Sequence, residues 1–166
     1  MKEILNHLLS YKTLSKEEAK NILIGIGQGR YTQVQTAAFL TVFMMRSITV
    51  AELEGFRDAM LELCVAIDVA DFDAMDVCGT GGDEKNTFNI STLAAFVVAG
   101  AGQAVVKHGN HGVSSVSGSS TVMEFLGYQF TNDKNPLIRD LEEANICFLH
   151  APLFHPAMKN VAPVRK

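Results

Sequence analysis

Four groups of residues suited to binding anions lie within one stretch of the chain, residues 76–120. They are GTGGD at 79–83, NIST at 89–92, KHGN at 107–110 and SGSS at 117–120. Each group follows or opens an apolar segment, and polar residues that follow successive parallel strands meet at one edge of the sheet. We therefore interpret the stretch as a binding site for a phosphorylated sugar.

The glycine loop and the lysine offer two different means of holding phosphate. The glycines of residues 79–83 can adopt positive φ and turn their N–H groups toward one point, which forms a concave nest for phosphate oxygens. Lys107 adds a full positive charge. Asp83 carries the wrong charge for a phosphate, so we expect it to accept hydrogen bonds from ribose hydroxyls or to orient the glycine loop.

The NIST sequence indicates the start of a helix that faces an anion. Asn89 can cap the helix, while the free N–H groups of Ser91 and Thr92, together with their hydroxyls, point at the ligand. Taken singly, each of the four groups has an ordinary explanation as a turn, a first helical turn, a loop or a solvated lysine. Their joint occurrence at the ends of successive strands favours a binding site.

The elements that would position these groups alternate between strand and helix. We predict strands near 75–79, 103–107 and 146–150, and helices near 90–101, 121–127 and 135–145. Thr121 with Glu124 reads as a capping box for the second of these helices. The alternation predicts a parallel sheet.

Three strands are few for a parallel sheet, which needs both faces covered. The chain also stops at Lys166, inside a helix that we expect to begin with His155 at the cap and Pro156 at its first position. We therefore expect the α/β domain to be truncated, and the chain to be the N-terminal half of a longer enzyme.

The first part of the chain has a purely helical pattern. Capping boxes at Ser15, Thr32 and Thr49 each precede apolar residues at helical spacing. Residues 39–45 are apolar on nearly every side, which indicates burial in a bundle or against a second subunit. With residues 68–74 as a linker, we predict a helical domain over 1–70 and an α/β domain over 71–166.

Composition narrows the class of protein. No apolar run approaches the roughly 20 residues that span a bilayer, and the N-terminus lacks a signal-peptide pattern, so we expect a cytoplasmic protein with no membrane partner. Cys64, Cys78 and Cys147 lack ligand spacing and are expected to be buried thiols. Because 18 acidic residues exceed 14 basic ones, no nucleic-acid partner is expected.

In combination, the four groups resemble anthranilate phosphoribosyltransferase. The resemblance covers the whole chain, from the helical start at 15–46 to the closing sequence HPAMKNVAPVR at 155–165. It implies a nucleoside phosphorylase/phosphoribosyltransferase-like α/β fold with a separate N-terminal all-helical domain that joins a homodimer. It also implies a reaction of tryptophan biosynthesis, in which the amino group of anthranilate displaces pyrophosphate from C1 of phosphoribosyl pyrophosphate with the help of Mg²⁺.

The resemblance assigns the site residues by matching motif. Phosphoribosyl pyrophosphate would be held by Gly79, Gly82, Asp83, Thr87, Asn89, Ile90, Ser91, Thr92, Lys107, Ser115 and Ser119. Anthranilate would be held by Gly79, His108, Asn110 and Arg165. Ser91 would also bind magnesium, and the Arg165 guanidinium would pair with the anthranilate carboxylate. No residue is assigned as a general acid or base, because the amine of anthranilate is nucleophilic as it stands.

The sequence departs from the family pattern at three positions. His111 stands where arginine is frequent, Val116 where lysine is frequent, and Thr121 where aspartate is usual. Two lost positive charges would weaken binding of pyrophosphate or alter anthranilate entry. Among the other histidines, His108 could equally be structural, and His150 is expected to support a loop.

Two alternatives stay open from the sequence. A pyrimidine nucleoside phosphorylase of related architecture would use inorganic phosphate and a nucleoside, although the patterns at 89–92 and at Asn110 disfavour it. The second alternative is an inactive binding or dimerisation fragment of the transferase, because the Asp-Glu pair that the family uses for a second magnesium ion would lie beyond Lys166.

Overall fold

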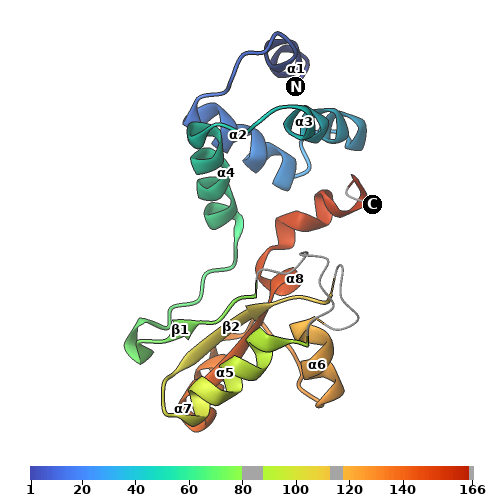
Figure 1. The fold of residues 1–166 in the computed structure, drawn as a ribbon. Helices are drawn as coiled ribbons and strands as arrows, with labels where there is room; N and C mark the ends of the chain where they lie inside the picture. The colour runs from blue at the N-terminus through green and yellow to red at the C-terminus, as the bar shows by residue number, and fades with distance from the viewer. Residues whose placement is uncertain (80–87, 113–117, 165–166) are drawn as a thin grey trace. The chain divides into compact units, whose positions relative to one another are not determined.

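The computed structural model describes residues 1–79, 88–112 and 118–164. The chain forms two compact units, Met1–Cys64 with His155–Lys166, and Val65–Phe154 (Figure 1). Within the described ranges, no helix has the length and apolar character needed to cross a membrane.

The first unit is helical, as predicted. It contains α1 (Lys2–Leu9), α2 (Lys16–Gly27), α3 (Gln33–Met45) and α4 (Val50–Leu63). The last three helices begin with the three predicted capping boxes, in which a hydroxyl accepts a backbone N–H and the side chain three residues later accepts one in return. The pairs are Ser15 with Glu18, Thr32 with Gln35, and Thr49 with Glu52.

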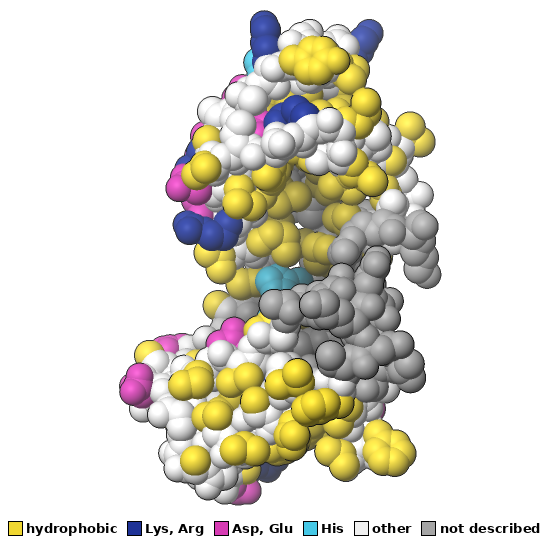
Figure 2. Space-filling model, viewed as in Figure 1, with side chains coloured by type: hydrophobic (Ala, Val, Ile, Leu, Met, Phe, Trp, Pro, Cys, Tyr) yellow, Lys and Arg dark blue, Asp and Glu magenta, His cyan; other side chains and the backbone are white. Residues whose placement is uncertain are grey.

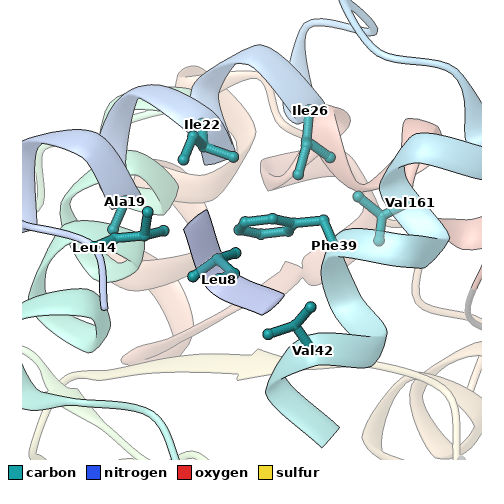
Figure 3. Close-up of a cluster of buried hydrophobic side chains, with 8 residues drawn as sticks. All are labelled: Leu8, Leu14, Ala19, Ile22, Ile26, Phe39, Val42 and Val161. Carbon is teal, nitrogen blue, oxygen red and sulfur yellow. The ribbon is translucent and has the colours of Figure 1, made fainter. Parts of the chain in front are cut away.

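A returning segment completes the core of this unit. It consists of two short 3-10 helices, η2 (Pro156–Asn160) and η3 (Ala162–Val164), and Pro156 stands at the first position, as predicted. Val161 belongs to the same buried cluster as side chains of α1, α2 and α3 (Figure 3). Asn160 Nδ2 donates to the carbonyl of Gly27 at 2.8 Å. The predicted division at residue 70 assigned this segment to the α/β domain, but here it packs with the helices.

Helix α3 is buried on one side only. Phe39 and Val42 lie in the core, and the Phe39, Phe43 and Phe56 rings meet edge to face. Met44 and Met45 are 85% and 82% exposed. The apolar stretch at 39–45 is therefore divided between the bundle core and the surface.

The second unit is built on a three-stranded parallel sheet, which confirms the predicted fold class. Its strands are β1 (Met75–Asp76), β2 (Val105–Gly109) and β3 (Ile146–His150), in the order β1-β2-β3. The third strand has the predicted bounds, the second is shifted by two residues, and the first is shorter than the predicted 75–79.

Helices cover both faces of the sheet. Strand residues alternate between two apolar clusters, so that Val105 faces α5 (Ile90–Gly100), whereas Val106 faces α7 (Lys134–Ala144). Helix α6 (Ser119–Phe125) packs on the α5 side through Met123, and α8 (Ala151–Phe154) packs on the α7 side through Phe154.

Three local predictions were wrong. Helix α6 begins at Ser119 after Gly118, not at a Thr121 capping box, because the chain at Gly118 lies against the loop after β2. Residues 68–74 are not a free linker, since they contain the 3-10 turn η1 (Ala70–Phe72) and pack on the α7-side cluster. Of the cysteines, only Cys147 is buried, while Cys78, beyond the short strand β1, is exposed and Cys64 is intermediate.

Helix α5 is apolar on more than one side. Ala95 and Ala99 are buried against the sheet, while large apolar side chains are exposed on the rest of the helix, namely Ile90, Leu93, Phe96 and Val97. Figure 2 shows apolar side chains gathered on the face of the second unit that carries this helix. A helix apolar all round is normally buried all round, and the described residues cover α5 mainly on one side.

Candidate functional site

The predicted anion-binding residues gather at the carboxyl edge of the sheet. Cys78 and Gly79 follow β1, Asn110 and His111 follow β2, and α8 begins directly after His150 at the end of β3. The strands are parallel and in register, with Asp76 paired to Val106 and Gly109 to His150, so these ends lie side by side. Crevices at the carboxyl ends of parallel strands are the usual ligand sites of open α/β sheets.

The start of α5 lies against Gly79. The Asn89 side chain caps the helix, as predicted, by accepting the N–H of Thr92 at 3.2 Å. A Cβ on Gly79 would come within 2.8 Å of Ser91 Oγ, so any larger residue here would require the Ser91 side chain to move. Gly79 and the start of α5 therefore meet at Ser91.

Two details of the predicted helix start need correction. The N–H of Thr92 is used by the Asn89 cap and is not free for an anion. Gly79 does not have the positive φ expected of it, and its small size serves the contact with Ser91 instead. The Thr92 hydroxyl is buried and has no hydrogen-bond partner among the described residues, so it is a polar group that a ligand could satisfy.

Lys107 is buried on the α5 side of β2, with only 1% of its surface exposed. Its Nζ lies 3.3 Å from the carbonyl of His108. Burial lowers the pKa of Lys107 from its ordinary value, although Cys78, just beyond β1, and Asp76, its last residue, act in the opposite direction. An anion placed beside this ammonium would restore its preference for the charged form.

The loop after β2 and the start of α6 are held together. A Cβ on Gly109 would lie 2.8 Å from the Cβ of Ser119, which places Ser119 over the end of β2. The N–H of Ser120 donates to the carbonyl of Asn110 at 3.2 Å, and the N–H of His111 donates to Asn110 Oδ1 at 2.8 Å. Asn110 is exposed, so its amide is open to a ligand.

Beside this loop, the structure joins Ser120, from the fourth motif, to a cluster whose other members the motifs did not predict as part of the site. Ser120 Oγ lies 2.8 Å from His150 Nδ1, and the His150 ring contacts the rings of both Phe130 and His111. His111 Nε2 lies 3.7 Å from Glu124 Oε1. The sequence placed His150 after a strand and in a supporting role, but nothing local to it pointed to Ser120, which is 30 residues away.

The described residues offer hard oxygen donors for a magnesium ion but no closed cage. No group of three or more His, Cys, Asp or Glu side chains that could hold a metal occurs in the part of the chain that the structure describes. Asn89 and Ser91 supply an amide and a hydroxyl oxygen at the start of α5. This donor set fits Mg²⁺, which is commonly held by few protein ligands and mainly by water and substrate phosphates.

Comparison with family models assigns both parts of the chain. Residues 2–64 match the helical bundle domain of a glycosyl transferase family, and residues 71–166 match the α/β domain of the same family. The chain belongs to this glycosyl transferase family. The α/β match alone covers more than half of the chain.

Relatives within the family share one name. Over its whole length the chain is 63% identical to an anthranilate phosphoribosyltransferase of Christiangramia forsetii, of which it covers 50%. The chain thus spans about half the length of the curated relatives it matches. This agreement confirms the resemblance that the four motifs indicated.

Solved structures of family members match the fold. The crystal structure of anthranilate phosphoribosyltransferase from Thermus thermophilus superposes with a TM-score of 0.86 at 36% identity, covering 97% of this chain and 49% of that one. The Saccharomyces cerevisiae enzyme, in complex with phosphoribosyl pyrophosphate and Mg, superposes with a TM-score of 0.83 at 28% identity, over 97% and 49% of the two chains.

The family residues predicted from the motifs fall into two groups. The structure brings together Gly79, Asn89, Ile90, Ser91, Thr92, Lys107, His108, Asn110 and Ser119 at or near the carboxyl edge of the sheet. Gly82, Asp83, Thr87, Ser115 and Arg165 lie outside the described residues, as does Val116. The roles of both groups stay predictions.

Proposed function

We propose that this chain carries the phosphoribosyl pyrophosphate-binding part of an anthranilate phosphoribosyltransferase. The reaction transfers the phosphoribosyl group to the amino group of anthranilate and yields N-(5-phosphoribosyl)anthranilate and pyrophosphate, a step of tryptophan biosynthesis. The observation that carries the proposal is the contact of Gly79 with Ser91 at the carboxyl edge of the sheet, together with the buried Lys107 that interacts with Cys78 and Asp76 there, in a chain 63% identical to an enzyme of that name.

Lys107 and the start of α5 are the proposed phosphate-binding elements. The buried ammonium of Lys107 supplies charge where water is scarce, so its attraction for a phosphate is strong. Ser91 and Thr92 add hydroxyls at the positive end of the α5 dipole, and Ser119 adds one from α6. The glycine loop, Asp83, Thr87 and Ser115 would complete the binding of phosphoribosyl pyrophosphate.

Anthranilate is assigned to the loop after β2. We infer that Asn110 and His108 contact the aromatic amine, while Gly79 bounds the site and Arg165 pairs with the carboxylate. In the transfer step, positive charge develops on the ribose ring and negative charge on the leaving pyrophosphate. Donors fixed in advance, such as Lys107, stabilise that separation without having to reorganise.

Magnesium is the proposed metal. Ser91 would bind it, and the ion would supply positive charge to the pyrophosphate group. The Saccharomyces cerevisiae enzyme in complex with phosphoribosyl pyrophosphate and Mg supports this assignment.

We infer that the helical unit joins a homodimer. Support comes from large apolar side chains that the first unit leaves exposed, including Val34, Met44 and Met45. Sedimentation at increasing concentration tests this inference, and a monomer throughout would contradict it. The cytoplasmic location expected from the sequence stays a prediction.

The loss of anthranilate fluorescence tests the reaction. The assay contains phosphoribosyl pyrophosphate and Mg²⁺, and compares this chain with a chimera that continues it with the second half of the Christiangramia forsetii relative. Activity of the chimera alone would establish that this chain supplies a working half of the site. Activity of neither, with both folded by circular dichroism, would reject the transferase in favour of a phosphorylase or a binding protein.

A further inference from the structure

The second unit contains a hydrogen-bonded pair, Ser120 and His150, that the proposed reaction does not use directly. Ser120 is 2% exposed, and its Oγ lies 2.8 Å from His150 Nδ1. The two residues come from different elements, since Ser120 lies in the first turn of α6 and His150 ends β3. The pair therefore ties α6 to the carboxyl edge of the sheet.

Ser120 also fixes the loop after β2. Its N–H donates to the carbonyl of Asn110 at 3.2 Å, while Asn110 Oδ1 accepts the N–H of His111 at 2.8 Å. These bonds hold Asn110 at its backbone and at its side chain. A hydrogen-bonded path thus runs from His150 through Ser120 to Asn110, and the ring contact of His150 with His111 gives a second link to the same residue.

The His150 ring is held on several sides. It stacks on Phe130, with 4.7 Å between ring centroids and an interplanar angle of 20°, and it makes a T-shaped contact with the His111 ring, with 5.1 Å between centroids. A ring fixed in this way presents Nδ1 to Ser120 in one direction, so the hydrogen bond carries orientation as well as energy.

The charged and titratable groups near His150 favour its neutral form. Burial lowers the pKa of His150 from its ordinary value, His111 lowers it further, and Glu124 on α6 opposes them. A neutral ring with its proton on Nε2 leaves Nδ1 to accept a hydrogen bond from the Ser120 hydroxyl. This hydrogen bond then fixes the Ser120 hydroxyl at the start of α6.

We propose that His150 is a positioning residue for the acceptor substrate, because it orients Ser120, and Ser120 in turn holds Asn110 at the mouth of the site. The proposal rests on the proposed function, in which Asn110 contacts anthranilate. His150 itself touches no substrate. Replacing His150 would leave the Asn110 side chain present but free to take several conformations. A contact with anthranilate that needs one particular conformation would then be weaker.

Three variants of this chain test the proposal through anthranilate binding, followed by its fluorescence. His150→Phe keeps the ring that stacks on Phe130 but removes Nδ1, Ser120→Ala removes the hydroxyl, and His150→Asn restores an acceptor near the position of Nδ1. We expect the first two to raise the Kd for anthranilate about tenfold, and His150→Asn to return it to within about threefold of the unchanged chain. Arg139→Gln, on the exposed surface of α7, is the matched control and should change nothing.

Inorganic pyrophosphate separates positioning of the acceptor from general damage. Its Kd should change by less than about twofold in all three variants, because Lys107 and the start of α5 are untouched. An anthranilate Kd that is unchanged in His150→Phe, or equally weak in His150→Asn and His150→Phe, would overturn the proposal.

Amide exchange in the absence of ligand keeps the test independent of the proposed function. If the unchanged chain binds no anthranilate, the assignment of that substrate to this chain fails. The exchange rate of the Ser120 N–H then tests the positioning role by itself. Faster exchange of that N–H in His150→Phe, with protection regained in His150→Asn, would support the role. Equal protection in all variants would refute it.

Discussion

Lys107 is the buried charge on which the proposed phosphate binding depends. Replacing it with alanine should raise the Kd for phosphoribosyl pyrophosphate and for inorganic pyrophosphate at least tenfold, because a charge-assisted hydrogen bond in a buried site is lost. Since burial lowers the pKa of Lys107, binding by the unchanged chain should weaken as the pH rises through that lowered pKa. Calorimetric titration with pyrophosphate across alkaline pH measures both effects.

The control for Lys107→Ala is a change in a residue assigned to the other substrate, anthranilate. Arg165→Ala should mainly weaken anthranilate binding and leave pyrophosphate binding close to that of the unchanged chain. Lys134→Ala, an exposed lysine at the start of α7, should affect neither ligand. Equal losses for both ligands in Lys107→Ala and Arg165→Ala would contradict the division of roles.

Glu52 is the buried charge of the helical unit. It is fully buried, and it accepts hydrogen bonds from Arg46, from the N–H of Leu14 at 3.0 Å and from the N–H and hydroxyl of Thr49, both at 2.9 Å. Burial would raise the pKa of Glu52, but these hydrogen bonds outweigh it and lower the pKa to about 2. The carboxylate therefore links α4 both to the end of α3 and to the start of α2.

The depressed pKa of Glu52 sets a pH window for stability. A carboxyl group whose folded pKa lies below its unfolded value, roughly 4.3, stabilises the fold above that value and loses the contribution as the pH falls toward 2. Glu52→Gln should lower the free energy of unfolding at neutral pH by about 3 kcal/mol, because Arg46 is left without its partner. It should also flatten the pH dependence between about pH 4.5 and 2.

Urea unfolding followed by circular dichroism at several pH values measures these two effects. Glu62→Gln is the matched control, since Glu62 is half exposed and pairs with Lys20 at the surface, where ion pairs contribute little. A Glu52→Gln variant as stable as the Glu62→Gln variant would show that the charge of the buried carboxylate does not stabilise the helical unit.

At the scale of elements, Gly118 sets how closely α6 approaches the sheet. A Cβ at this position would overlap the backbone of Asn110, His111 and Gly112, and its distance to the Asn110 carbonyl oxygen would be 2.5 Å. Backbone atoms cannot move aside as a flexible side chain can. Gly118→Ala should therefore push α6 off the loop, break the bond from Ser120 to Asn110, and destabilise the chain by about 2 kcal/mol.

Gly100→Ala provides the comparison for Gly118→Ala. Gly100 ends α5, and a Cβ there would meet nothing within 4 Å, so the change should be neutral or stabilising by a few tenths of a kcal/mol. Denaturant unfolding of the two variants side by side gives the difference. Equal stability of Gly118→Ala and the unchanged chain would mean that α6 accommodates the methyl group by a movement the loop tolerates.

The starts of the helices show which features the sequence could predict. Capping boxes at Ser15, Thr32 and Thr49 depend on residues three apart, and all three were predicted correctly because the pattern is local. The same pattern failed at Thr121, where contact of Gly118 with a loop several residues earlier decided the helix start. The cap at Asn89 was local and was found, whereas the pair of Ser120 with His150 joins distant residues and was not.

At the scale of the whole molecule, the chain does not divide into two continuous segments. The pattern of residues 155–164 resembled the continuation of an α/β domain, and the matched family model also runs through it. In the structure, Val161 lies in the helical core and Asn160 bonds to Gly27, 133 residues away in sequence. A contact at that separation leaves no local signal in composition or periodicity, so the sequence could not show it.

This discontinuity predicts that the helical unit needs the end of the chain. Ending the chain at Phe154 would uncover the side of the core that Val161 fills and remove the contacts of Gly27 with Asn160 and Ala157, so the unit should lose about 2 to 3 kcal/mol of stability. Val161→Ala should reproduce part of the loss, and Lys159→Ala, an exposed neighbour, should reproduce none. Hydrogen exchange of the amides in α2 and α3 reports the helical unit separately from the sheet unit, whose amides in β2 and β3 should keep their protection. Undiminished protection of α2 and α3 in the shortened chain would mean that residues 1–64 form a complete core without the returning segment.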